Sequence, residues 1–449
     1  MNDAIQFKKM TTAPIGRLIT SLAIPTIMSM MITSIYNMAD TFFVGKLGRS
    51  ATGAVGIVFS LMAIIQAVGF TLGMGSGSNI SRLLGQKENE KANMIASTGF
   101  FSAIILGLIL AIFGLSNVSL LMKLLGSTDT ILPYAIDYAK YILYGAPVMC
   151  SSFVLNNIIR SQGKAVLSMV GIGLGGILNI ILDPIFIFYF DMGISGAAIA
   201  TLISQIISFL ILISFFVFNK TTVKINFKYF SHSLIGLIIK TGIPSFSRQG
   251  LASIAGVALN LAAKPYGDAA VAALSIVTKI FMFILSVLIG FGQGYQPVIG
   301  YNYGAQKYNR VREAFYFSLK ACTLIMLALA IIGYIYAPQI IQAFQKNDID
   351  VVTIGVFTFR AQCIILPLHP LIVLSNMTFQ VIGKAFEATF LSSCRQGIFF
   401  LPLIFIMPLL MGLTGVQLTQ TFADILSSIC AGIFIFPFIK SLNNKENTL

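Results

Sequence analysis

The chain has 449 residues, of which 57% are hydrophobic and only 10% are charged. A soluble domain carries roughly 25% charged residues, so the composition excludes an ordinary soluble protein and indicates an integral membrane protein. The formal net charge of +14 does not indicate a nucleic-acid partner, because the basic residues lie in short segments between apolar runs. The five cysteines stand singly in apolar sequence, so we expect neither a disulfide framework nor a metal site, and we expect no cofactor.

Twelve apolar segments follow one another, and each is long enough to cross about 30 Å of hydrocarbon as a helix. The predicted spans are 18–43, 52–78, 94–116, 133–160, 166–190, 194–218, 236–263, 269–297, 314–337, 352–380, 387–410 and 413–438. Basic residues gather in the N-terminus, in alternate loops and in the C-terminus, for example Lys8, Lys87 and Lys224. The positive-inside rule therefore predicts a multi-pass membrane protein with both termini in the cytoplasm. We expect the membrane to be a bacterial inner membrane.

The chain repeats itself at an offset of 219 residues, because Ile24-Pro25 matches Ile243-Pro244, and Gly73 and Gly75 match Gly292 and Gly294. Six helices per repeat give both halves the same membrane orientation, with a cavity expected between them. We therefore predict an all-α integral membrane fold of twelve transmembrane helices in two six-helix, pseudo-symmetric bundles. The predicted lobes are 1–220 and 236–449, joined by a cytoplasmic linker over 221–235, and we expect a monomer.

The stretch 177–190, which reads ILNIILDPIFIFYF, places an acid at membrane depth. Asn179 and Asp183 are four residues apart, so they share one face of a helix. Pro184 follows directly and predicts a bend that frees a backbone oxygen. A carboxylate and a carboxamide beside a loosened carbonyl can hold a proton or a small hard cation. The alternative is a structural hydrogen bond at the kink.

A second intramembrane acid, Asp40, lies at the end of the first predicted span, one turn after Tyr36 and Asn37. If Asp40 and Asp183 share a cavity, their charges repel and they titrate jointly. An acid at the membrane interface is the simpler alternative for Asp40.

Further polar groups at membrane depth in the same half are Asn156, Asn157 and Thr201, although a helical threonine often only bonds its own backbone. At the 219-residue offset Asp40 maps to Leu259 and Asp183 to Pro402. This broken symmetry predicts that ion handling belongs to the first lobe.

The second lobe carries one acid well inside a predicted span, Asp424, together with the basic residues Arg248, Lys279 and Arg395. Asp424 either neutralises Arg395 or Arg248, which is the favoured interpretation, or lines the cavity and meets a cationic substrate. Arg248 and Lys279 give the lobe an affinity for anionic groups. All four are therefore candidates for a substrate cavity.

Several short patterns have a plain structural explanation. The GxGxxG match at 171–176 lies inside an apolar span, so it indicates helix packing through small residues rather than nucleotide binding. The glycine runs at 73–77 and 290–294 predict close packing or flexing points. His369 stands between Pro367 and Pro370 and is expected to satisfy a kink rather than carry protons. No catalytic or phosphate-binding motif is present, so we expect no enzyme.

Taken together, these segments resemble the multidrug and toxic compound extrusion (MATE) family over essentially the full length. The resemblance rests on IPTIMSMMITSIYNMADTFFVGKLG, ISRLLGQKE and NIILDPIFIF in the first half, and on TGIPSFSRQG, YGDAAVAALSIVTKI and QPVIGYNYGA in the second. Within the family, the sequence is similar to the DinF-like bacterial branch, which includes MepA-type exporters.

The resemblance implies a cation site in the first lobe made of Asp40, Asn157 (or Asn156), Asn179, Asp183 and Thr201. It also implies secondary active efflux of amphipathic, often cationic compounds in exchange for protons or sodium by alternating access. The alternative is a flippase for a lipid-linked or polyanionic substrate, which the intramembrane basic residues favour.

Overall fold

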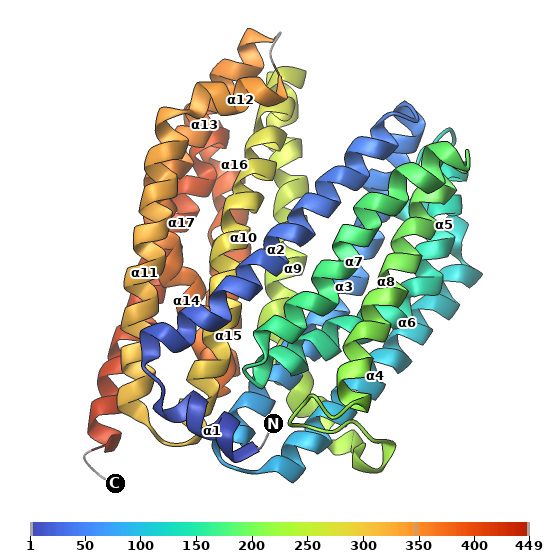
Figure 1. Ribbon diagram of the computed structural model, residues 1–449. Helices are drawn as coiled ribbons and strands as arrows, with labels where there is room; N and C mark the ends of the chain where they lie inside the picture. Colours follow the sequence, from blue (N-terminus) through green and yellow to red (C-terminus); the bar gives the residue numbers. More distant parts are fainter. Residues whose placement is uncertain (1–2, 346–347, 447–449) are drawn as a thin grey trace.

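The computed structural model describes residues 3–345 and 348–446, and over these ranges it is helical and contains no β-strand. Figure 1 shows two helical bundles that meet at the end carrying both termini and separate toward the opposite end. We call these the closed end and the open end. The helix α2 runs obliquely from the closed end into the first bundle.

The first bundle and the short helix across the closed end contain the following elements: α1 (Asp3–Thr12), α2 (Ile15–Gly45), α3 (Arg49–Gly85), α4 (Asn89–Ser116), α5 (Val118–Leu124), α6 (Leu132–Ser161), α7 (Ala165–Pro184), a π-helical segment (Ile185–Tyr189) and α8 (Gly193–Val217). The core of this bundle lies around α6, which packs against α3, α4 and α8. Most of the apolar length of α6 is therefore buried inside the protein.

The second bundle contains the remaining long helices: α9 (Ile235–Ala263), α10 (Asp268–Gly304), α11 (Tyr308–Ile335), α12 (Ala337–Phe344), α13 (Ile349–Ile365), α14 (His369–Ile382), α15 (Ala385–Ser393), a π-helical segment (Cys394–Ile398), α16 (Phe400–Met411) and α17 (Leu413–Glu446). Three-residue 3₁₀ turns stand at Phe227–Tyr229, His232–Leu234, Lys264–Tyr266 and Leu366–Leu368.

Eleven segments of the described chain are long and apolar enough to cross a membrane. The remaining predicted span corresponds to α9, whose 29 residues are long enough to cross but are less apolar. Its polar residues Arg248 and Gln249 line cavities inside the protein, so they need not face lipid. The prediction of an all-α membrane protein with two helical bundles is confirmed.

Two of the predicted helix irregularities occur at prolines. After Pro184 the hydrogen-bond pattern changes from α to π, and the Phe190 N–H donates to the Ile185 carbonyl at 2.9 Å. At Pro367 a 3₁₀ turn separates α13 from α14, and His369 Nδ1 lies 3.3 Å from the Ile365 carbonyl oxygen. His369 thus satisfies the kink, as the sequence predicts.

Glycines bring the two bundles into backbone contact at the closed end. A Cβ at Gly75 of α3 would lie 2.1 Å from the carbonyl oxygen of Ile238, and a Cβ at Gly242 of α9 would lie 1.9 Å from that of Thr71. Gly290 of α10 packs in the same way on α2, where Thr26 donates to its carbonyl oxygen at 2.6 Å. We call these contacts the glycine seam. The predicted close packing at both glycine runs is confirmed.

The connection between the bundles is held against the first bundle by side chains. Gln162 accepts hydrogen bonds from the Thr222 and Val223 N–H groups at 2.5 and 3.2 Å. The Asn93 side chain accepts from Lys224 N–H at 2.7 Å. These bonds fix the irregular stretch to the ends of α4 and α6.

Candidate functional site

A buried group of polar side chains forms between α7 and α8. Asp183 is fully buried and Asn179, one helical turn earlier, is 2% exposed. The Asn179 amide donates to Asp183 Oδ1 at 3.1 Å and lies 3.3 Å from the Thr201 hydroxyl on α8. The four-residue spacing therefore brings the acid and the amide together, as the sequence predicts.

The helices α2 and α6 complete this group. The Tyr138 hydroxyl of α6 donates to Asp40 Oδ2 at 3.4 Å. Asp40 interacts electrostatically with Asp183, and buried Tyr36 interacts with both acids. We call Tyr36, Asp40, Tyr138, Asn179, Asp183 and Thr201 the acid cluster. It contains the two acids of the first lobe, Asp40 and Asp183, that lie well inside predicted spans.

Three oxygens of the acid cluster are buried and have no hydrogen-bond partner among the described residues: Asp40 Oδ1, Asn179 Oδ1 and Asp183 Oδ2. Buried polar atoms without partners cost free energy and are rare in proteins. Carboxylate and carboxamide oxygens are suitable ligands for a small hard cation, and a carboxylate also takes a proton. The donor set therefore fits either sodium or a proton.

Asn156 and Asn157 do not join the acid cluster, and here the sequence interpretation needs correction. Along α6, Asn157 lies about 28 Å further than Tyr138, because each helical residue rises about 1.5 Å. The Asn157 side chain donates to the Phe153 carbonyl at 2.7 Å and accepts from Arg160, while Asn156 donates to the Ser168 carbonyl at 3.0 Å.

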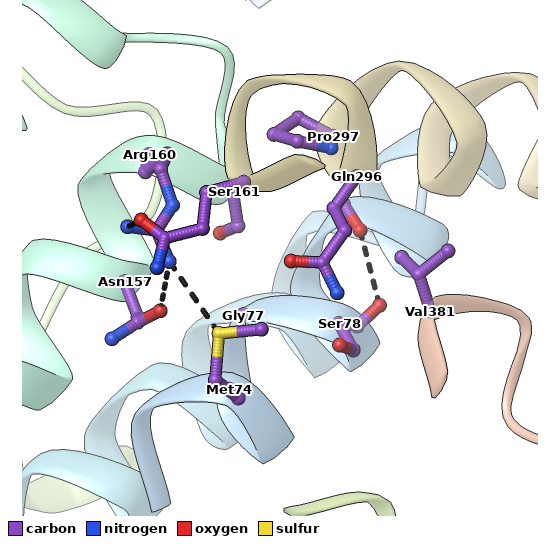
Figure 2. Close-up of a pocket in the computed structure, with 11 residues that line it drawn as sticks. Met74, Gly77, Ser78, Asn157, Arg160, Ser161, Gln296, Pro297 and Val381 are labelled. Atoms are coloured by element: carbon purple, nitrogen blue, oxygen red, sulfur yellow. Dashed lines mark hydrogen bonds between the residues drawn. The ribbon is translucent and has the colours of Figure 1, made fainter. Parts of the chain in front are cut away.

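Figure 2 shows where Asn157 lies instead. Its amide oxygen meets the Arg160 guanidinium, which also donates to the Met74 sulfur at 3.4 Å, in a small pocket near the closed end. Across that pocket, Arg160 donates to Gln293 of the second bundle at 2.7 Å. Asn157 therefore belongs to a contact between the bundles.

Among the secondary candidates, Tyr36 lies in the acid cluster and Pro184 marks the change to π-helix. The Asn37 side chain is half-buried, and no hydrogen bond joins it to either acid in the described part of the chain. Tyr138 is the residue that the sequence interpretation missed. The sequence gives little reason to single out Tyr138, because the same span also contains Tyr134, Tyr141 and Tyr144. Nothing in the spacing of the four tyrosines selects one of them.

Two larger cavities adjoin one another, and one of them borders the acid cluster at Tyr36. One, of about 230 Å³, lies between the bundles and is lined by Tyr36 and Gly176 on one side and by Arg248 and Met282 on the other. The second, of about 290 Å³, lies within the second bundle and shares Arg248 and Met282 with the first. We call the two together the central cavity. Tyr36 belongs to the acid cluster and also lines this cavity.

The four candidate residues of the second lobe lie in three different places: on the cavity wall, behind it, and on the protein surface. Arg248 and Arg395 line the central cavity. Asp424 is 1% exposed and lies behind it, where it accepts from Arg395 Nε at 2.8 Å and lies 3.1 Å from His369 Nε2. Lys279 is exposed and is not among the cavity-lining residues, so its assignment to the cavity is wrong. Lys279 lies on a different face of α10 from the residues that line the cavity, which include its neighbours Thr278 and Met282.

Two bundles of membrane-spanning helices around a cavity, with buried acids beside it, define a membrane transporter of the two-lobe class. Comparison with known proteins agrees. The family model MatE matches residues 25–185 and 244–406, once in each half of the chain. The chain therefore belongs to the MATE family of transporters.

Two curated relatives are named multidrug export protein MepA. The one from Staphylococcus aureus is 29% identical over 427 residues, which is 94% of each chain, and the one from Staphylococcus saprophyticus is 28% identical over 417 residues, which is 92% of each. A solved structure described as the outward-facing conformation of a multidrug resistance MATE family transporter is 28% identical, with a TM-score of 0.92 over 97% of this chain and 98% of that one. These names do not favour the flippase alternative.

Proposed function

We propose that the protein is a secondary antiporter that exports amphipathic drug-like compounds in exchange for protons or sodium. The observation that carries this proposal is the acid cluster. It offers three buried oxygens without hydrogen-bond partners among the described residues, and it contacts the central cavity through Tyr36. The names of the relatives support the substrate class.

In the proposed mechanism, a cation enters the acid cluster from the open end and neutralises part of the charge on Asp40 and Asp183. Asp40 and Tyr36 lie on α2, while Asp183 lies on α7, so a cation between them changes how α2 packs on the first bundle. Because Tyr36 also lines the central cavity, this movement changes the cavity wall and lowers its affinity for the compound. Export requires that the ion and the compound bind the two states with different affinities.

The closed end carries both termini, and the positive-inside rule assigns that end to the cytoplasm. The conformation in Figure 1 then corresponds to an outward-facing state of a monomeric transporter of the inner membrane. In the opposite state, the glycine seam separates and the other end closes.

The proposal is tested with purified protein in liposomes and a fluorescent amphipathic compound. Proton and sodium gradients are imposed separately, each with and without a membrane potential. Uptake that follows one gradient identifies the coupling ion, and dissipating that gradient should stop it. Uptake that is equal with and without both gradients would contradict antiport and indicate a passive pathway.

A further inference from the structure

The charged side chains that line the central cavity are all basic. Arg160 and Arg248 line the part between the bundles, and Arg248 and Arg395 line the part within the second bundle. No aspartate or glutamate is among the lining residues of either part in the described chain. This pattern does not fit a cavity built for cations, which the family resemblance leads one to expect.

Arg395 is already neutralised, but the other two arginines are not. Asp424 accepts from Arg395 at 2.8 Å. Arg248 donates to the amide oxygen of Asn376 at 3.4 Å, and Arg160 donates to the amide oxygens of Gln293 and Asn157. In the described residues no carboxylate lies within ion-pair distance of Arg248 or Arg160.

Arg248 has the position that matters most, because it borders both parts of the central cavity. A guanidinium removed from bulk water gains most from an anionic partner, and its planar donors match carboxylate or phosphate oxygens two at a time. A positively charged ligand there would meet a like charge without a compensating acid.

The rest of the cavity wall suits an apolar body of drug-like size. Phe281, Met282, Leu259 and Leu285 line the part within the second bundle. Its volume of about 290 Å³ lies at the lower end of the range for ligand pockets, and the adjoining part adds about 230 Å³. A charged head at Arg248 would leave both parts of the cavity for the apolar body of the ligand.

We infer that the preferred substrate is an amphipathic organic anion, with one carboxylate held by Arg248 and an aromatic body against Phe281 and Met282. This inference rests on the proposed transport function and specifies its substrate. It has a mechanistic consequence, since an anion and a coupling cation bind different groups and cannot compete for one carboxylate. Exchange then depends on the movement of α2 and Tyr36.

The test uses the full-length protein and two fluorescent probes with the same ring system, anthracene-9-carboxylate and (anthracen-9-ylmethyl)trimethylammonium. Binding is measured by probe fluorescence without any ion gradient; the chain contains no tryptophan to interfere. We expect the carboxylate to bind at least about tenfold more tightly than the ammonium compound. Equal or tighter binding of the ammonium compound would overturn the inference without the need for any variant.

Arg248→Gln should remove most of the preference for the carboxylate, and Arg248→Lys should retain part of it because charge remains while the planar donor pair is lost. Arg360→Gln is the matched control, since Arg360 lies in the same bundle, donates to the Tyr334 carbonyl and does not line the cavity. Unchanged carboxylate binding in folded Arg248→Gln protein would refute the role of Arg248.

Transport of both probes separates this inference from the proposed function. Gradient-driven export of the ammonium probe alone would leave antiport standing and overturn the anion preference. Tight carboxylate binding without gradient-driven movement of either probe would support the anion site and contradict antiport.

Discussion

At the scale of single residues, the acid cluster combines buried carboxyl and amide oxygens with incomplete hydrogen bonding. Asp183 has one oxygen bonded to Asn179 and one without a partner in the described chain, and Asp40 is likewise half-satisfied by Tyr138. A purely structural hydrogen-bond network would satisfy these atoms, because an orphaned buried acceptor costs about 1–3 kcal/mol. The arrangement is therefore better suited to taking up a cation than to holding helices together.

Asp183→Asn and Asp40→Asn each remove a carboxylate while keeping its size. We expect either change to lower gradient-driven export by more than about tenfold, because the ion no longer distinguishes the two states. Export is measured in liposomes, with the amount of folded protein determined in parallel. Asp137→Asn is the control, since Asp137 adjoins Tyr138 on α6 but pairs with Lys140 at the surface. Normal export by either cluster variant would refute the ion site.

Tyr138→Phe removes one hydroxyl and keeps the ring. We expect a partial loss of export, about three- to tenfold, and a shift in the ion concentration that gives half-maximal transport, because the hydroxyl positions Asp40 rather than carrying the ion. The exposed Tyr134 on the same helix provides the control Tyr134→Phe. A loss of transport rate with no change in ion dependence would argue for a packing role alone.

The sequence allows much of this site to be predicted, and the reason for each failure is geometric. Asn179 and Asp183 are correct neighbours because they lie on one helical face, and local spacing suffices to predict that. Tyr138 was missed and Asn157 was misplaced because both depend on the height of α6 relative to α2 and α7 along the bundle axis. Sequence spacing within one helix carries no information about that height.

At the scale of helices, Asp424 joins three elements of the second bundle, because it lies on α17 and contacts His369 of α14 and Arg395 of the π-helical segment. Gln420 donates to the same carboxylate oxygen as Arg395, at 2.8 Å. This contact set supports the structural interpretation of the acid.

Asp424→Asn should therefore destabilise the protein, by about 3 kcal/mol, since removal of one partner of a buried pair leaves the other uncompensated. The measurement is thermal unfolding in detergent. The double variant Asp424→Asn with Arg395→Gln should recover part of the loss, because the two side chains interact directly. Additive losses in the double variant would show that the pair contributes little.

The glycine seam gives a second prediction for helices. In Gly242→Ala the new Cβ would meet backbone rather than a side chain, so α3 and α9 must separate at the closed end. We expect the free energy of unfolding of the conformation described here to fall by about 1–3 kcal/mol, which is measured by thermal unfolding. Gly250→Ala on the same helix is the control, because nothing lies within 4 Å of its added Cβ. Equal stability of the two variants would contradict the proposed packing.

At the scale of the whole molecule, the apolar periodicity and the repeat predict the number of spans and the two bundles. Hydrophobic length decides which segments cross the bilayer, and this is local information. The angle between the two bundles could not be predicted from the sequence. It depends on which end of the molecule is closed, and here the glycine seam closes the end that carries the termini. The same sequence must also adopt the opposite state if the proposed mechanism holds.

Orientation in the membrane is tested by cysteine labelling of intact cells. Lys46 directly follows α2, which ends at the open end (Figure 1), so Lys46→Cys should react with an impermeant maleimide. Lys228 lies in the connection between α8 and α9, on the side that carries the termini, so Lys228→Cys should react only after lysis. The parent protein is a suitable background, because four of its cysteines are buried and Cys430 is only partly exposed. The reverse labelling pattern would invert the proposed topology.

The glycine seam also has a consequence for the energy supply of the cell. A transporter that opens a wide cavity to one side has to prevent leakage through the other, and a single continuous file of water molecules would conduct protons and discharge the membrane voltage. At Gly75 and Gly242 main chain meets main chain, which leaves no room for a water molecule at these two contacts. Under the proposed antiport, these close contacts would limit proton leakage, and the ion gradient would persist between transport cycles.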